Sequence, residues 1–415
     1  METPSCCKEY AGLSRRGVLK GMLGVGATTA FFGTTFTQTA YAATQSADQV
    51  LVVLSLRGAA DGLSLVVPHG DPVYYTARPR IAIPKESLLA QDSFFGLHPS
   101  LAPLLPLWNA GKVAAVHATG LPVANRSHFA AMEELEDADP GSTARVGWIN
   151  RLIGTDDYTN PLQGLGMGLS TPITSMYGPE ATVTTAGVAD MVLAGADQWD
   201  TEHRRPLSLG TLWADADGVV GRGGRAALSA VDDFAPVRAI SDTPANGAAY
   251  SDDDLGHALA DTARTIRADV GAEVISVDHN GGWDMHANLG TLTWGSMLNA
   301  AGALATSLAA FFTDLGPLAD KVTVVTISEF GRRVRENANY GLDHGHGNVM
   351  FLLGAGVRGG YYGTWPGLVD SLDADLDVTT DYRSVLAEVV TKRLGRSVAT
   401  VFPGFAPESV GALVG

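Results

Sequence analysis

The sequence predicts a doubly wound α/β domain, in which a mostly parallel sheet has helices on both faces. Several runs of β-branched residues and leucine are apolar throughout, which is typical of strands that are buried on both sides. Helical segments separate several of these runs, and this alternation favours parallel pairing. Hydrophobic residues make up 46% of the chain, enough for one large core.

Five segments are predicted to be buried strands. The first ends at an Arg-Gly turn, and the second ends in Ala-Thr-Gly. The five segments, in chain order, are Val50–Leu56, Lys112–His117, Glu273–Val277, Val322–Ile327 and Val349–Leu353.

Three segments are predicted to be helices. Thr293–Leu315 is rich in alanine, and its leucines and phenylalanines can form one apolar stripe. Ser251–Arg267 begins with a serine and three aspartates, which suit the N-terminal cap and dipole of a helix. Thr380–Leu394 begins with Thr-Asp and is ended by Gly395.

The domain organisation follows from these elements. Residues 43–415 are predicted to form a single hydrolase-like α/β domain. Within it, residues from about 196 to 250 are predicted to be an irregular insertion, because clusters of glycine and proline at 221–225 and 244–247 interrupt any long element.

The N-terminus has the pattern of a twin-arginine signal peptide. Ser14–Lys20 contains Arg15 and Arg16 and precedes the weakly apolar stretch Gly21–Phe36, and Ala40-Tyr41-Ala42 supplies a cleavage site. An N-terminal membrane helix is the alternative, but the stretch is short and diluted with glycine and threonine. Residues 1–42 are therefore expected to direct the folded chain to the twin-arginine translocase, and from there to the periplasm, the cell wall or the medium.

Charge and cysteine content narrow the possible partners. The full chain has a net charge of -16, so neither nucleic-acid binding nor stable membrane insertion is expected. No later segment was expected to span a membrane. Both cysteines, Cys6 and Cys7, lie in the signal segment. Any metal in the mature protein must then be held by carboxylates, imidazoles or hydroxyls.

Polar residues gather where the predicted strands end, which is where open α/β sheets bind ligands. Four histidines and four acids at these places are candidate ligands for one or two divalent cations, with Zn, Mg, Mn and Ca all possible. These candidates are Asp61, His128, Asp284, His286, Glu329, Asp343, His344 and His346.

Several of these residues have a second interpretation. Asp61 lies in a glycine-flanked turn, and Glu329 could pair with a nearby arginine instead of a metal. Ser127 precedes a helical pattern, so it is either a helix N-cap or a nucleophile beside the positive end of a helix dipole. The pair Asp278-His279 competes with Asp284 and His286 at the same strand end.

Six motifs make the chain resemble the family called domain of unknown function 1501, which is exported by the twin-arginine pathway and belongs to the alkaline-phosphatase and sulfatase-like superfamily. The likeness runs from about Val50 to the C-terminus. The motifs are Arg57–Gly62, Leu97–Pro99, Asn125–Phe129, Gly282–Asn288, Ser328–Arg332 and Asp343–Asn348.

The resemblance implies an alkaline-phosphatase-like fold with two metal sites and a hydroxyl nucleophile at a helix start. Asp61, Ser127, Asp284 and His286 match these places in order. The later part departs from the superfamily pattern, because Asp343-His344 does not directly follow its strand. Either Glu329 replaces the usual ligand while His344 serves the other metal, or the Asp343-His344 segment loops back.

The expected function is that of an exported, metal-dependent hydrolase acting on phosphate mono- or diesters, in a small molecule or a polymer. Ser127 would attack phosphorus, and Arg126 or Arg332 would steady the phosphoryl oxygens. A sulfate-ester hydrolase is an alternative, although no Cys/Ser-x-Pro-x-Arg motif surrounds Ser127. An exported binding or assembly protein that has lost activity is the other alternative.

Export can be tested at the paired arginines. Replacing Arg15 and Arg16 together with lysine should leave the precursor in the cytoplasm, because the translocase recognises the guanidinium pair. Cell fractionation followed by immunoblotting measures this. Normal secretion of the double variant would refute the predicted route.

Overall fold

A computed structural model describes residues 34–36, 46–155, 160–196 and 200–414. Apart from Thr34–Phe36, the predicted signal peptide lies outside the described residues. Thr34–Phe36 forms the short strand β1, which pairs antiparallel with β7 at one edge of the main sheet.

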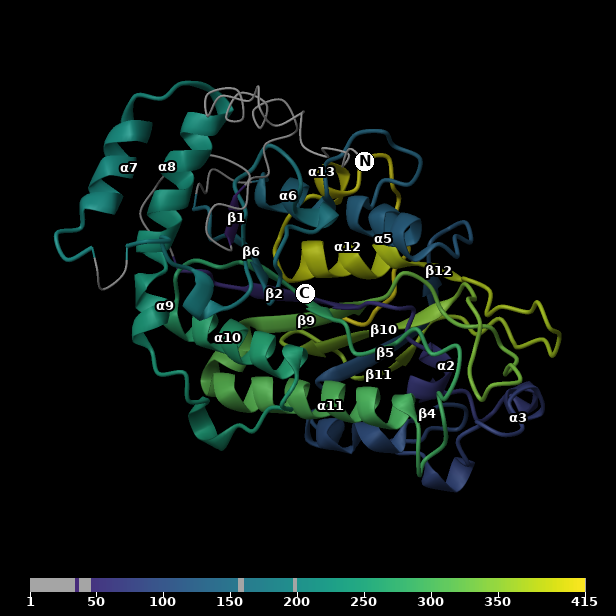
Figure 1. Ribbon diagram of the computed structural model, residues 1–415. Helices are drawn as coiled ribbons and strands as arrows, with labels where there is room; N and C mark the ends of the chain where they lie inside the picture. The colour runs from purple at the N-terminus through teal and green to yellow at the C-terminus, as the bar shows by residue number, and fades with distance from the viewer. Residues whose placement is uncertain (1–33, 37–45, 156–159, 197–199, 415) are drawn as a thin grey trace, which may run out of the picture.

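The centre of the molecule is one large sheet (Figure 1). Its neighbouring strands run in the order β1-β7-β6-β8-β2-β9-β10-β5-β11, and β12 also pairs with β5. Most neighbours are parallel, and the antiparallel pairs are β1 with β7 and β10 with both β9 and β5. The bounds are β7 Val183–Thr185, β6 Gly164–Met167, β8 Val274–His279, β2 Val50–Leu56, β9 Val322–Ile327, β10 Asn348–Gly354, β5 Val113–Gly120, β11 Gly360–Tyr362 and β12 Thr380–Asp381.

Helices cover both faces of this sheet (Figure 1). Successive side chains of a strand point to opposite faces. Val52 and Leu54 of β2 accordingly join one core cluster, while Leu51 and Val53 join another. The first cluster packs under α10 Asp254–Ala268 and α11 Ser296–Leu315, and the second under α5 His128–Asp137, α6 Trp148–Ile153, α12 Tyr382–Lys392 and α13 Val398–Val401. The prediction of a mixed α/β fold with a mostly parallel sheet is confirmed.

The remaining elements are short and mostly connect the strands. A second sheet contains only β3 and β4, which pair antiparallel. The bounds are β3 Val66–Val67, β4 Gly96–Leu97, α2 Gly62–Leu65, α3 Pro72–Ala77, α4 Leu105–Asn109, and the 3₁₀ helices Lys85–Ser87, Pro99–Leu104, Thr174–Met176, Val188–Asp190, Ala245–Gly247 and Gly316–Lys321.

The predicted strands and helices lie close to their observed positions. Helix α10 starts three residues later than predicted, with the Asp253 carboxylate accepting a hydrogen bond of 2.8 Å from the backbone N–H of Gly256. The Asp381 carboxylate caps α12 in the same way through the N–H of Arg383, at 2.9 Å. Both caps agree with the acidic residues that the sequence places before these helices.

Strand β10 runs opposite to its two neighbours, which the predicted parallel pattern did not anticipate for this strand. The chain between β9 and β10, residues 328–347, contains no helix. A parallel connection needs a crossover that usually includes a helix, so a helix-free connection returns the chain antiparallel. As a result, the start of β10 lies at the sheet edge where β2, β8, β9 and β5 end.

The segment 196–250 is more regular than predicted within the residues that the structure describes. It contains α7 Arg204–Ala214, α8 Gly218–Asp233 and α9 Ala235–Ala239, and α8 passes through the glycine cluster that was expected to interrupt it. At Gly224 a Cβ atom would lie 2.6 Å from the Trp213 ring. Glycine therefore allows close packing of α8 against α7 and does not end the helix.

One stretch in the described part of the chain, Ser296–Lys321, is long and apolar enough to cross a membrane by length and composition. From the sequence, no segment after the signal segment is predicted to span a membrane. Its apolar window is 56% buried inside the fold, and α11 packs against α10 and the sheet. The apolar composition of α11 is therefore explained by its packing in the core of the domain.

Asp61 forms a buried ion pair with Arg78. The two carboxylate oxygens accept hydrogen bonds of 2.5 and 3.0 Å from the guanidinium, and the residues are 2% and 0% exposed. Arg78 also donates to the carbonyls of Val334 and Arg333, which lie far away in the sequence. Asp61, a candidate metal ligand from the sequence, therefore holds a core contact between distant segments.

This ion pair gives a prediction for stability. Arg78→Met should lower the free energy of unfolding by about 3–5 kcal/mol, because it leaves the Asp61 carboxylate buried without its cation. Urea denaturation followed by circular dichroism measures the change. Arg204→Met removes an exposed ion pair with Glu202 and should change stability by less than about 0.5 kcal/mol. Equal losses in the two variants would contradict the structural role of Asp61.

Candidate metal centre

The candidate site lies at one edge of the main sheet, where loops from several strands meet. His128 begins α5, which follows β5. Asp284 and His286 lie in the loop after β8, and His344 lies shortly before β10. Because β10 is antiparallel to β9 and β5, its leading loop reaches the edge where the other strands end. The segment that contains Asp343 and His344 thus loops back to the edge where the parallel strands end. This path corresponds to one of the two alternatives that the sequence left open.

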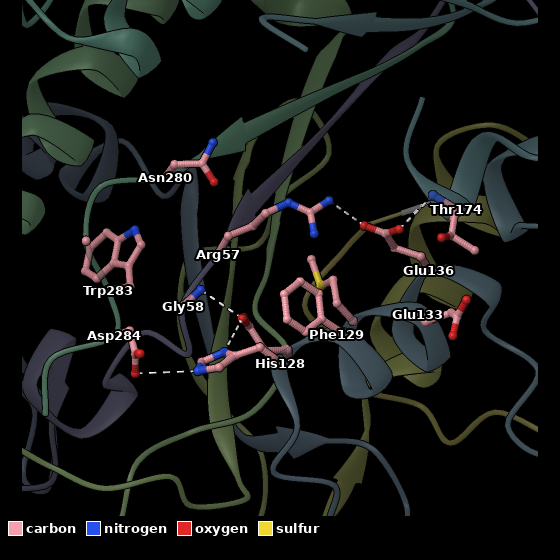
Figure 2. A pocket seen from close by; sticks show the side chains of 13 residues that line it. Arg57, Gly58, His128, Phe129, Glu133, Glu136, Thr174, Asn280, Trp283 and Asp284 are labelled. Carbon is pink, nitrogen blue, oxygen red and sulfur yellow. Dashed lines mark hydrogen bonds and ion pairs between the residues drawn. The ribbon is translucent and has the colours of Figure 1, made fainter. Parts of the chain in front are cut away.

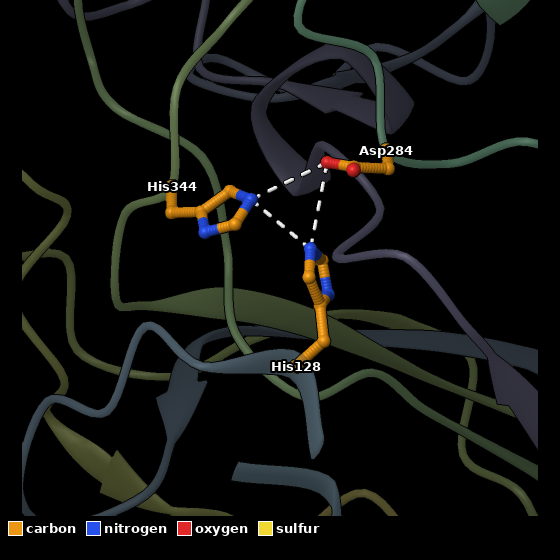
Figure 3. A group of neighbouring side chains, drawn as sticks. All are labelled: His128, Asp284 and His344. Atoms are coloured by element: carbon orange, nitrogen blue, oxygen red, sulfur yellow. Dashed lines mark hydrogen bonds and ion pairs between the residues drawn. The ribbon is translucent and has the colours of Figure 1, made fainter. Parts of the chain in front are cut away.

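Three of these side chains form a group that can hold a metal ion, and they are the only such group among the described residues: His128, Asp284 and His344 (Figure 3). The Nε2 atoms of His128 and His344 are 3.0 Å apart. Asp284 Oδ1 lies 3.5 Å from the first of these nitrogens and 3.3 Å from the second. His286 adjoins the group, with its Nε2 2.9 Å from His344 Nε2 and 3.1 Å from Asp284 Oδ1.

The other ring nitrogen of each histidine faces a hydrogen-bond acceptor. His128 Nδ1 lies 2.9 Å from Glu329 Oε1, His286 Nδ1 lies 3.0 Å from Asp343 Oδ1, and His344 Nδ1 lies 2.9 Å from the carbonyl oxygen of Arg126. Carboxylates and carbonyls accept hydrogen bonds, so these partners favour the tautomer with the proton on Nδ1, and in that tautomer the Nε2 lone pair faces the group. Converging lone pairs repel one another unless a cation lies between them. Outer carboxylates and carbonyls of this kind are typical partners of metal-binding histidines.

Asp284 is held in place by Arg332. The Arg332 guanidinium is 1% exposed and donates to Asp284 Oδ1 at 2.6 Å. Partial burial alone would raise the pKa of Asp284, but the hydrogen bond and charge of Arg332 hold that pKa below its ordinary value. The hydrogen bond from His286 also lowers the pKa of Asp343, and partial burial lowers the pKa of His344.

Arg332 donates its other hydrogen bonds to backbone carbonyls, in contrast to the substrate contact expected for it. Arg126, the other candidate for that contact, is ion-paired with Asp375. His346 Nε2 lies 2.9 Å from the carbonyl oxygen of Leu121 and takes no part in the group. Ser127 is exposed at the N-cap of α5, and its side chain makes no capping hydrogen bond.

The competing pair at the end of β8 does not join the group. His279 is 3% exposed, burial lowers its pKa to about 4, and its Nδ1 accepts a 3.3 Å hydrogen bond from the Trp283 indole. Asp278 is ion-paired with Arg57. Both residues are thus held by partners outside the histidine group.

A pocket of about 610 Å³ adjoins the group, and His128 and Asp284 lie together at one end of it (Figure 2). Glu329 also lines this pocket. Gly58 also lines the pocket, and a Cβ atom there would approach the backbone nitrogen of Asp284 to 2.8 Å. Arg57 also lines this pocket and was not singled out as a site residue from the sequence. Its position directly after β2, at the end of a predicted strand, was the available signal.

No curated protein matches the chain. The segment that contains Asp284, His286, Glu329, Asp343 and His344 does match a family model, whereas His128 lies upstream of the match. Residues 241–386 match the family described as Protein of unknown function (DUF1501), and this match supports the assignment of the chain to that family.

Proposed function

We propose that the protein is an exported, metal-dependent hydrolase of phosphate mono- or diesters, with one divalent cation at the histidine group. The observation that carries this proposal is the convergence of the Nε2 atoms of His128 and His344 with one carboxylate oxygen of Asp284, beside an open pocket and with His286 adjoining. We place the chain in the alkaline-phosphatase and sulfatase-like superfamily as part of the same proposal, on the strength of the sequence motifs.

The donor set fits a zinc-type cation better than magnesium or calcium. Imidazole nitrogen suits zinc and similar transition metals, whereas magnesium and calcium prefer ligands made only of oxygen. Tetrahedral zinc with ligand bonds of about 2.0–2.1 Å separates its ligand atoms by about 3.3 Å. The separations of 3.0–3.5 Å among His128, Asp284 and His344 are close to that value. When bound, such a cation acts as a Lewis acid that polarises an ester and makes a nearby water molecule more acidic.

The surrounding residues hold the ligands in position. Glu329 also accepts a 2.8 Å hydrogen bond from the N–H of Gly58, so one carboxylate connects the loop after β2 to His128. Asp343 orients His286, and it accepts a second hydrogen bond of 3.2 Å from the side chain of Asn337. Fixed ligand orientation raises metal affinity, because less order has to be imposed when the ion binds.

Ser127 is the proposed nucleophile. Its hydroxyl is exposed and free of a capping bond, and the next residue is the ligand His128. In the proposed reaction Ser127 Oγ attacks phosphorus, the bond from phosphorus to the alcohol oxygen breaks, and the departing alcohol takes the serine proton. Water then hydrolyses the phosphoserine and restores the hydroxyl.

Metal binding tests the proposed centre directly. His344→Ala and His286→Ala should each lower metal affinity by more than about 100-fold, because loss of a ligand exceeds the effect of losing an outer partner. Metal content measured by elemental analysis after dialysis against a weak chelator should fall from about one ion per chain to almost none. His346→Ala is the matched control and should retain the ion, since His346 bonds to a backbone carbonyl. Full metal content in both ligand variants would place the site elsewhere.

Substitutions can distinguish a nucleophilic role of Ser127 from a helix-capping role. Because its side chain makes no capping bond, Ser127→Ala should change the free energy of unfolding by less than about 0.5 kcal/mol. Turnover of a phosphate ester such as p-nitrophenyl phosphate should fall by about a thousandfold or more, with the metal retained. Ser127→Asp can still cap the helix but should be equally inactive. Near-native turnover in Ser127→Ala would leave hydrolysis by water as the surviving mechanism.

A further inference from the structure

The pocket beside the histidine group has a distinct second end, formed around Arg57 (Figure 2). Arg57 donates from Nε to Asp278 and from Nη2 to Glu136, the latter at 2.6 Å. Its Nη1 has no partner among the described residues, and its side chain is 26% exposed. Two buried carboxylates therefore hold the guanidinium still and leave one donor edge open.

Helix α5 connects the two ends of the pocket. His128, Met132 and Glu136 are spaced four residues apart and share one helix face, and Phe129 and Glu133 lie beside them. Eight residues of α-helix span about 12 Å. A substrate whose ester lies at His128 could therefore extend by about that length along the helix to Arg57.

No unpaired positive charge is among the described residues that line this pocket. The charge of Arg57 is offset by Asp278 and Glu136, while the other lining carboxylates include Glu133, Asp284 and Glu329. Glu133 is paired with Arg145, and Asp284 with Arg332. A second anionic group on the substrate would find repulsion here and no free cation, so the lining favours an uncharged group.

The remaining lining suits a ring that carries hydroxyl groups. Phe129 is 92% exposed on one wall, and the exposed residue Asn280 lies on another. The negative face of an aromatic ring attracts the weakly positive C–H bonds on the flat face of a sugar. Trp283, the other aromatic residue of the lining, is 1% exposed, so the pocket offers one open ring face and no slot between two rings. A sugar hydroxyl can both accept from Arg57 Nη1 and donate to a carboxylate.

We infer that this pocket binds the part of the substrate that is not cleaved, and that this part is an uncharged saccharide. The inference rests on the proposed hydrolase function, because the saccharide is the alcohol part of an ester only if the protein hydrolyses that ester. Phe129 supplies the stacking face, and Arg57 fixes one oxygen at the far end.

Direct binding tests the inference without any need for turnover. The metal-loaded protein is titrated with a neutral glucose trisaccharide, a galacturonate trisaccharide and adenosine, and binding is measured by ligand-observed NMR. The neutral trisaccharide should bind, the anionic one should bind at least about tenfold more weakly, and adenosine should not bind. Preference for adenosine, preference for the anionic sugar, or no binding of the neutral sugar would overturn the inference.

Variants tie the binding to this pocket. Phe129→Ala should weaken binding of the neutral trisaccharide by about tenfold, and its high exposure makes a folding defect unexpected. Val123→Ala is the matched control, because Val123 is 75% exposed but does not line the pocket. If Phe129→Ala leaves the affinity for the trisaccharide unchanged, the sugar binds elsewhere on the protein, and the inference is overturned.

A variant that lacks one proposed metal-binding histidine distinguishes failure of the inference from failure of the proposed function. His344→Ala should lose the metal but keep the trisaccharide affinity within about twofold, because Phe129 and Arg57 remain. Saccharide binding by a wild-type protein that holds no metal would contradict the proposed function and leave the ligand class standing. A wild-type protein that holds metal but binds no neutral saccharide would contradict only the inference.

Discussion

The guanidinium of Arg332 is the contact on which the arrangement of the candidate site depends. It donates to the carbonyls of Gly58 and Ala59 after β2, of Trp283 after β8, and of Leu342 before β10. Gly58, the most distant of these acceptors, lies 274 positions from Arg332 in the sequence. A planar group with five donors can satisfy several buried carbonyls at once, which lysine cannot do. The same guanidinium also donates to Asp284, so the arrangement of the loops and the position of a proposed metal ligand depend on one side chain.

The central strands and long helices could be predicted because their signals are local. Apolar runs specify β2, β8 and β9, and acidic caps specify the starts of α10 and α12. The direction of β10 could not be read from its own residues, since an apolar run looks the same in either direction. It depends on whether the preceding connection contains a helix.

The site could be predicted in part, for a similar reason. Residue types and strand ends indicated His128, Asp284, His286 and His344, all of which lie at the same sheet edge. The partners of individual side chains were not predictable, because they come from distant positions. Asp343 meets His286 across 57 residues, and the sequence contains no sign of that pairing. Asp61 was expected at the metal, yet Arg78 supplies its positive charge from within the chain.

The start of α5 at His128 has a consequence for the affinities of the ligands proposed for this site. The first backbone N–H groups of a helix have no partner within it, and together with the helix dipole they place a partial positive charge at its start. In α5 the Ser127 side chain does not occupy these donors. That positive end would oppose the proposed cation on its own but would favour the same cation accompanied by an oxyanion. By thermodynamic linkage, whatever factor an oxyanion adds to metal affinity, the metal adds to the affinity for the oxyanion.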